Sequence, residues 1–219
     1  MATLHPNLVV LKNKSLRNLF TKIRDQETNV RDFEFYSCRL MTVLAEETVA
    51  ELDNAIEQVT VHTPCAAFQG EVVDVDKICA VSIVRAGDSL LGCVRAILPG
   101  VSVGKILIQR DERTVEKEAK LYYCKLPPKI SEKVVILCDP MLATGGSAKK
   151  AIESLVDVGV KPSNIIFSNV VCCPEGLKNL AAAYPEVKIV TAAVDECLNE
   201  DKYIVPGLGD YGDRFFNTV

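Results

Sequence analysis

The sequence predicts an α/β fold built on a parallel, doubly wound sheet. Short apolar runs alternate along the chain with amphipathic stretches of helical period, which is the pattern of strands joined by helical crossovers. The runs are rich in β-branched residues without clean alternation, which is typical of strands buried on both faces. The 219 residues are 48% hydrophobic, which is enough apolar material for one core. We therefore expect a single domain over residues 1–219.

The expected elements follow in order along the chain. Ser15 is placed to cap a helix over residues 16–23, and apolar residues at helical spacing predict a second helix over residues 28–52. Gly100, Gly159 and Pro185 lie where three later helices should end. We expect those helices over residues 89–98, 147–158 and 175–183, and strands over residues 78–84, 105–109, 134–138, 165–173 and 187–194.

Composition excludes several classes of protein. The net charge is −4 and no basic stripe stands out, which argues against a nucleic-acid partner. No apolar run approaches the roughly 18 residues of a membrane helix, and the first residues lack the pattern of a secretion signal. Four of the nine cysteines (Cys79, Cys138, Cys172 and Cys173) lie in apolar runs. We read them as buried, reduced thiols and expect a cytoplasmic protein without a membrane partner.

A phosphate site is expected after the strand at residues 134–138, because ligands of open α/β sheets bind at the carboxyl ends of strands. Two glycines there let consecutive N–H groups face one concavity at a helix N-terminus, and Thr144 and Ser147 add hydroxyls. The spacing of a Walker loop is absent. Asp139 either holds a ribose diol or caps the next turn. The loop reads Asp139, Pro140, Met141, Leu142, Ala143, Thr144, Gly145, Gly146 and Ser147.

Arginines follow two other strands. Arg85 comes after residues 78–84 and Arg110 after residues 105–109. Guanidinium groups bind phosphate oxygens bidentately, so the pair favours an anion site, although each could also form a surface ion pair. Seven of the ten residues at 111–120 are charged. This segment is either a solvated loop or a mobile lid over a charged ligand.

The C-terminal segment contains a literal GxGxxG in Gly207, Gly209 and Gly212. A dinucleotide fingerprint needs a following helix and an acid about 20 residues on. Only seven residues follow Gly212, so we reject that interpretation. A tight turn that exposes backbone donors and acceptors is the better reading.

Residues 137–147 resemble the phosphoribosyl pyrophosphate (PRPP) loop of the uracil phosphoribosyltransferase family, and residues 203–214 resemble its uracil-binding signature. The resemblance runs from His5 to Thr218. Pro140 replaces a second acid that the wider fold commonly carries, a departure shared by the uracil branch, and Asn217 stands where glycine is common. The resemblance implies the type I phosphoribosyltransferase fold with N-terminal helices, a flexible β flap at about residues 111–126 and a base-binding hood at residues 203–219.

The resemblance also implies a reaction and its residues. Uracil and PRPP would give UMP and diphosphate in pyrimidine salvage, with Mg²⁺ as cofactor. A non-proline cis peptide is expected near Arg85–Ala86, and Asp210 is expected to engage Mg²⁺ through water. At Tyr211 the backbone is expected to matter more than the ring. The implied catalytic residues are Asp210, Arg110 and Arg85; the PRPP site comprises Arg85, Arg110, residues 139–147 and Asp210; the uracil site comprises Ile204, Gly209, Asp210 and Tyr211.

The sequence also bears on oligomeric state, on effectors and on other possible functions. Family habit implies a homodimer or homotetramer, and GTP is a candidate effector. Two other functions stay open: a regulatory relative that grips RNA, against which the acidic balance argues, and a nucleotide-sensing or scaffolding module without turnover.

Overall fold

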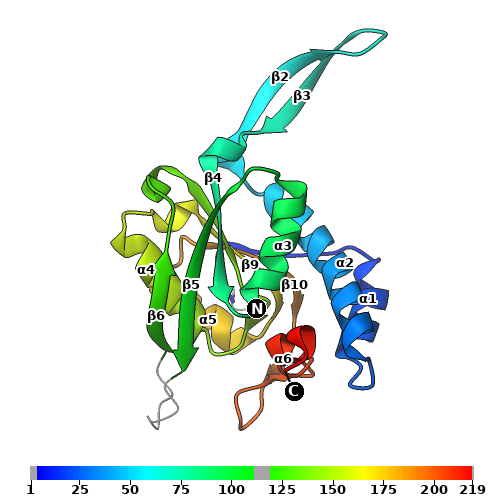
Figure 1. The fold of residues 1–219 in the computed structure, drawn as a ribbon, viewed down its shortest axis with the longest axis vertical. Coiled ribbons are helices and arrows are strands. Elements are labelled where there is room, and N and C mark those ends of the chain that lie inside the picture. Colours follow the sequence, from blue (N-terminus) through cyan, green and yellow to red (C-terminus); the bar gives the residue numbers. More distant parts are fainter. Residues whose placement is uncertain (1–3, 111–118, 219) are drawn as a thin grey trace.

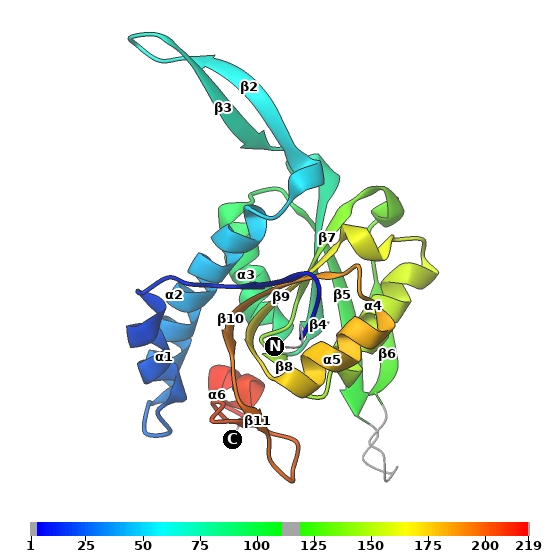
Figure 2. The ribbon, with the colours of Figure 1, turned by 180° about the vertical axis from the view of Figure 1, so that it is seen from behind.

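The computed structural model describes residues 4–110 and 119–218, and it confirms the predicted α/β architecture (Figures 1 and 2). The main sheet has the order β1-β10-β9-β7-β4-β5-β6, with β8 paired to β9. Its pairs are parallel except that β6 runs antiparallel to β5. The strands are β1 (Leu8–Val10), β4 (Ile78–Val84), β5 (Ser102–Arg110), β6 (Ala119–Lys125), β7 (Val134–Cys138), β8 (Met141–Leu142), β9 (Ile165–Cys172) and β10 (Lys188–Val194).

Helices cover both faces of this sheet, which is therefore doubly wound. Alternate residues of β4 divide between two cores: Ile78 and Ala80 pack on one face, while Cys79 and Val81 pack on the other. The strand is buried on both faces, as its β-branched run predicts. The first face carries α1 (Leu16–Arg24), α2 (Val30–Val49) and α3 (Gly87–Ile97), and the second carries α4 (Gly146–Asp157) and α5 (Pro174–Ala183).

Smaller elements lie outside the main sheet. A hairpin of β2 (Ile56–His62) and β3 (Ala67–Val73) projects from the body (Figure 1). A short antiparallel pair, β11 (Cys197–Leu198) and β12 (Ile204–Val205), precedes the C-terminal helix α6 (Tyr211–Phe216). Single 3₁₀ turns occur at Asp53–Ala55, Val75–Lys77, Ile130–Glu132 and Pro162–Asn164.

Most expected elements are present with shifted ends. Residues 78–84 and 134–138 are strands with the expected bounds, and the bounds of the other three expected strands and the three later helices lie within three residues of expectation; β1 and β8 were not expected. The expectation for Ser15 is wrong, because its side chain makes no capping hydrogen bond. The second helix starts two residues late, at Val30, and is capped by Asn29, which accepts from the Asp32 amide at 3.0 Å. The non-proline cis peptide is Val84–Arg85, one bond before the expected place.

The four cysteines of the apolar runs are placed as expected. Cys79, Cys138, Cys172 and Cys173 are buried, and all nine cysteines are free thiols. Three others (Cys65, Cys124 and Cys197) are exposed, so not every thiol serves as a small core residue. Within the described ranges, no helix combines the length and apolar character needed to cross a membrane.

Candidate active site

A cleft of about 570 Å³ opens at the carboxyl ends of β4 and β7. Its wall includes Ala86, which follows β4, and Asp139, which follows β7. The C-terminal segment supplies the opposite wall. Two stretches that lie far apart in the sequence therefore meet at the sheet edge where ligands of this architecture bind. The remaining lining residues are Met141, Ala143, Asp201, Lys202, Tyr203, Ile204, Gly209, Asp210, Tyr211 and Gly212.

Residues 139–147, which we call the phosphate loop, are held from behind through their carbonyl groups. A carbonyl that is bonded to the body of the protein faces away from a ligand, so the loop can present its N–H groups instead. Pro140 and Leu142 are buried and serve this anchoring. The carbonyl of Asp139 accepts from Asn169 Nδ2 (3.2 Å), that of Pro140 from the amides of Val170 and Val171 (3.0 Å each), and that of Thr144 from Asn179 Nδ2 (2.9 Å).

The glycines of the loop begin helix α4. Gly145 occupies the N-cap position at φ 85°, a left-handed conformation that favours glycine. Gly146 is the first residue of the helix, and Ser147 lies half-buried in its first turn. Thr144, Gly145 and Gly146 line a neighbouring hollow of about 430 Å³ together with Lys149. The structure thus places Asp139, Met141 and Ala143 in the main cleft and the helix start beside it.

The C-terminal wall is anchored by a buried tyrosine. The Tyr211 ring is 1% exposed, lies edge-on to Phe33 at 5.5 Å and stacks on Phe215 at 5.7 Å. Its hydroxyl donates to the Met41 sulfur at 3.3 Å. Burial raises the pKa of Tyr211, so the hydroxyl remains a proton donor at neutral pH. The ring therefore fixes the turn to helix α2, a role that the sequence analysis did not anticipate.

Ile204 and Asp210 are the two ends of the C-terminal turn, residues 204–210. The Asp210 side chain caps α6 by accepting from the Asp213 amide at 2.9 Å. Ile204 is buried within β12, and both residues line the main cleft. Gly207 and Gly209 have φ values of 58° and 81°, whereas Gly212 is helical. The strand before them is two residues long and antiparallel, unlike the parallel strand of a dinucleotide site.

The two expected arginines lie at the ends of neighbouring strands: Arg85 directly follows β4, and Arg110 ends β5. In the described part of the chain the cleft is lined by Ala86 and not by Arg85. The Arg85 guanidinium instead donates to Asp213 Oδ1 at 2.6 Å and to Thr218 Oγ1 at 2.7 Å. The Thr218 hydroxyl also donates to Asp213 Oδ1 at 2.7 Å, and this bond, followed by the one from Arg85, lowers the pKa of Asp213.

The expected flap falls partly outside the described residues. Residues 111–118 lie in that gap, and the rest of the segment is the edge strand β6. Among the described residues, no group of three or more His, Cys, Asp or Glu side chains forms a metal site. Asp139 and Asp210 nevertheless place two carboxylates on the wall of one cleft.

Several residues of the site were missed by sequence reasoning. Asp201 and Lys202 line the cleft from the loop between β11 and β12, beside Tyr203 at the start of the expected hood. Arg24 and Asp195 form an ion pair of 2.7 Å behind the C-terminal turn. Asp195 directly follows β10, so the rule of strand ends could have found it. Arg24 carries no comparable signal.

The fold and the cleft define a sheet-edge ligand site in which the loop after β7 faces the C-terminal segment, with a glycine-containing helix start beside it. The chain matches the family model described as "Uracil phosphoribosyltransferase" over residues 10–218. It is 49% identical over 213 residues to the uracil phosphoribosyltransferase of Dictyostelium discoideum, with 97% of each chain covered. It is 49% identical over 206 residues to that of Saccharomyces cerevisiae, with 94% and 93% covered. The chain belongs to the uracil phosphoribosyltransferase family.

A solved structure supports the same fold. The AQ2163 protein from Aquifex aeolicus superposes with a TM-score of 0.83 at 31% identity, covering 96% of this chain and 98% of that one.

Proposed function

We propose that this chain transfers the phosphoribosyl group of PRPP to N1 of uracil, giving UMP and diphosphate in pyrimidine salvage. The bond between C1′ and the diphosphate oxygen breaks, the bond between C1′ and N1 forms, and N1 loses its proton. One observation carries the proposal: the first part of the phosphate loop (Asp139, Met141 and Ala143) and the C-terminal turn line a single cleft. That arrangement supports bringing a sugar phosphate and a base together, and holding two reactants in this way lowers the barrier to their reaction.

Each wall of the cleft has its own part in this proposal. Asp139 would accept hydrogen bonds from the ribose hydroxyls, and the start of α4 would bind the 5′-phosphate with backbone N–H groups and hydroxyls. Arg85 and Arg110 would bind the diphosphate and stabilise the negative charge that develops on it. The phosphate contacts would come from Ala143, Thr144, Gly145, Gly146 and Ser147.

The C-terminal turn would read the base through its backbone. Ile204 and Gly209 would offer the donors and acceptors that match the edge of uracil, with Asp210 between base and sugar. Cytosine presents a donor where uracil presents an acceptor. It would leave backbone groups unpaired in the cleft and be rejected.

The carboxylates of the cleft fit Mg²⁺. This ion prefers oxygen ligands and is commonly held by one or two carboxylates together with substrate phosphates. Asp139 and Asp210, on facing walls of one cleft, have that chemistry. A bound ion would neutralise charge on the diphosphate. Neither His5 nor His62 lines the cleft, so the residues available there orient the reactants and stabilise charge.

The test is diphosphate release from PRPP and Mg²⁺ with uracil, cytosine or hypoxanthine as the base. We expect release with uracil and less than about a hundredth of that rate with the other bases. Release with hypoxanthine but not with uracil would show that the substrate is another base and would contradict the proposal. No release with any base, together with RNA binding or with PRPP binding alone, would favour the regulatory or the sensing function. Repeating the uracil reaction with and without GTP tests the candidate effector.

We also propose that the chain forms a homodimer, or a tetramer built from such dimers, through the β2–β3 hairpin. An isolated two-stranded hairpin is marginally stable in water. This one exposes Val61, Phe68 and Val72 at 46%, 57% and 45%, and it projects away from the body (Figure 2). A second copy would cover these side chains. Light scattering should give a multiple of 23.9 kDa, and Phe68→Glu should shift it toward one copy. The free cysteines fit the cytoplasmic location that we propose.

A further inference from the structure

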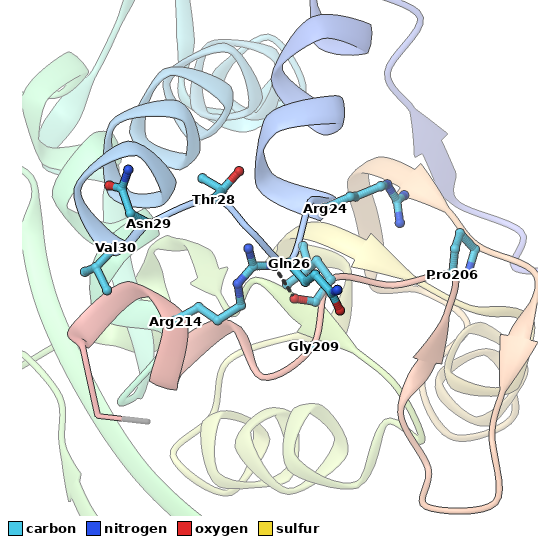
Figure 3. Close-up of a pocket in the computed structure, with 9 residues that line it drawn as sticks. Arg24, Gln26, Thr28, Asn29, Val30, Pro206, Gly209 and Arg214 are labelled. Atoms are coloured by element: carbon cyan, nitrogen blue, oxygen red, sulfur yellow. Dashed lines mark hydrogen bonds between the residues drawn. The ribbon is translucent and has the colours of Figure 1, made fainter.

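Two arginines from opposite ends of the chain converge on residues 204–210, which we call the base turn. Arg24 is the last residue of α1, and Arg214 belongs to α6. Figure 3 shows both beside the stretch from Pro206 to Gly209, in a pocket of about 500 Å³ that also touches the start of α2. This pocket and the main cleft share Gly209, so the base turn contributes to the wall of both.

Arg24 holds the base turn through Gly207. Its Nη1 donates to the Gly207 carbonyl and to Asp195 Oδ2, each at 2.7 Å, and its Nη2 donates to Asp195 Oδ1 at 2.7 Å. Asp195 Oδ2 in turn accepts from the Gly207 amide at 2.8 Å. The ion pair thus binds both backbone groups of Gly207: Asp195 accepts from its N–H, and Arg24 donates to its carbonyl. Asp195 is buried, so these charge-assisted bonds are shielded from water.

Arg214 joins the next residue of the turn to the N-terminal helices. Its Nη1 donates to the carbonyls of Leu208 (2.7 Å) and Ile23 (2.8 Å), and its Nη2 donates to that of Asp25 (2.6 Å). The guanidinium lies over the Phe33 ring at 4.3 Å. Three carbonyls from two segments are therefore fixed by one planar fork, a geometry that a lysine ammonium cannot reproduce.

The direction of these bonds matters for the cleft. The carbonyls of Gly207 and Leu208 both accept from arginines, Arg24 and Arg214, that do not line the main cleft. The same turn contributes Ile204 and Gly209 to the lining of the main cleft, so holding these two carbonyls also holds the segment that carries both residues. Recognition by backbone groups requires a fixed backbone, because a turn that can rearrange can also satisfy the wrong base.

We propose that Arg24 and Arg214 are positioning residues that fix the base turn in the shape that selects the pyrimidine. The inference rests on the proposed function and assigns neither arginine a contact with substrate. It predicts an effect confined to the base. Losing either guanidinium should weaken binding of uracil and relax discrimination against cytosine. PRPP should keep its affinity, because all of its proposed contacts except Asp210 lie outside the base turn.

The experiment measures KM for uracil, KM for PRPP, kcat and the ratio of rates with uracil and cytosine. Arg214→Met should raise KM for uracil by about tenfold or more, the change expected when one charge-assisted bond is lost. KM for PRPP should change less than about twofold. Arg214→Lys should recover only part of the loss. Arg17→Met, at an exposed position of α1, is the matched control and should behave as wild type.

Each outcome decides between readings. A variant that is merely less well folded loses kcat with both KM values unchanged, and that result would overturn the proposal, as would an equal rise in the two KM values. If Arg214→Met fails to fold, Arg24→Met and Arg214→Lys provide the same readouts. A wild-type chain without uracil turnover would sink the proposed function. An active wild type with an unchanged uracil KM in the arginine variants would sink only this inference.

Discussion

Replacing Gly87 by alanine tests how tightly the two substrate loops are packed. Gly87 is the first residue of α3 and follows the loop at Arg85 and Ala86. A Cβ added there would overlap the carbonyl oxygen of Cys138 and lie 3.2 Å from its carbonyl carbon and 3.3 Å from Ser82 Cβ. Cys138 is the last residue of β7, directly before Asp139. The obstacle is backbone in the centre of the sheet, so no side chain can swing aside to relieve it.

The magnitude follows from this contact. Overpacking a core costs about 1–3 kcal/mol, and a backbone obstacle places this site at the upper end. For a chain of this size each kcal/mol corresponds to roughly 2–4 °C in Tm, so Gly87→Ala should lower Tm by about 6–12 °C. If the carbonyl of Cys138 moves instead, Asp139 moves with it. KM for PRPP should then rise more than KM for uracil.

The same helix provides a control of opposite sign. Gly92 is exposed in the middle of α3, and a methyl group added there would meet no described atom within 4 Å beyond the backbone of its own helix. Gly92→Ala removes backbone freedom from the unfolded chain and should stabilise the protein by about 0.5–1 kcal/mol. Thermal unfolding of the two variants beside wild type is the measurement. A Gly87→Ala variant as stable as wild type would refute the packing argument.

Two further predictions concern charge. Asp213→Ala removes the ion pair that orients the Arg85 guanidinium, the group proposed to bind the diphosphate. KM for PRPP should therefore rise by up to about fivefold, the ceiling expected for an exposed ion pair. In an Arg85→Ala background the same change should add nothing, and additive effects in a double-mutant cycle would contradict the link. Burial lowers the pKa of His5, so the unfolded chain takes up its proton more readily. The contribution of neutral, buried His5 to stability should be complete above about pH 6.5 and should be lost as the pH falls below that value. His5→Gln should therefore flatten the fall in Tm between about pH 7.5 and 5.5. Equal slopes in both proteins would show that another group is responsible.

The central sheet could be predicted from sequence because its strands are buried on both faces. Runs rich in β-branched residues, such as residues 78–84 and 134–138, predict strands in a chain where such runs alternate with helical stretches, and the predicted bounds of these two are correct. The β2–β3 hairpin could not be found in this way. Its residues are mostly exposed, so no core imposes a pattern on them. Local signals also misled: Ser15 is a good capping residue by type, yet α1 begins without its side chain.

The site was predictable where chemistry coincides with a strand end. Asp139 and Arg85 were found because each directly follows a buried strand. The contacts that orient these groups depend on tertiary structure. Arg85 meets Asp213 across 128 positions of sequence, and Arg214 meets Ile23 across 191. Neither pairing leaves a trace in local spacing.

The most direct test of the account is a crystal structure of the chain with UMP, since this one molecule spans both halves of the proposed site. The account places the phosphate at the backbone amides of residues 144–147, the ribose hydroxyls at Asp139, and the uracil ring against the backbone of Ile204 and Gly209. Density for UMP with its base outside the cleft, or with its phosphate away from the start of α4, would contradict it.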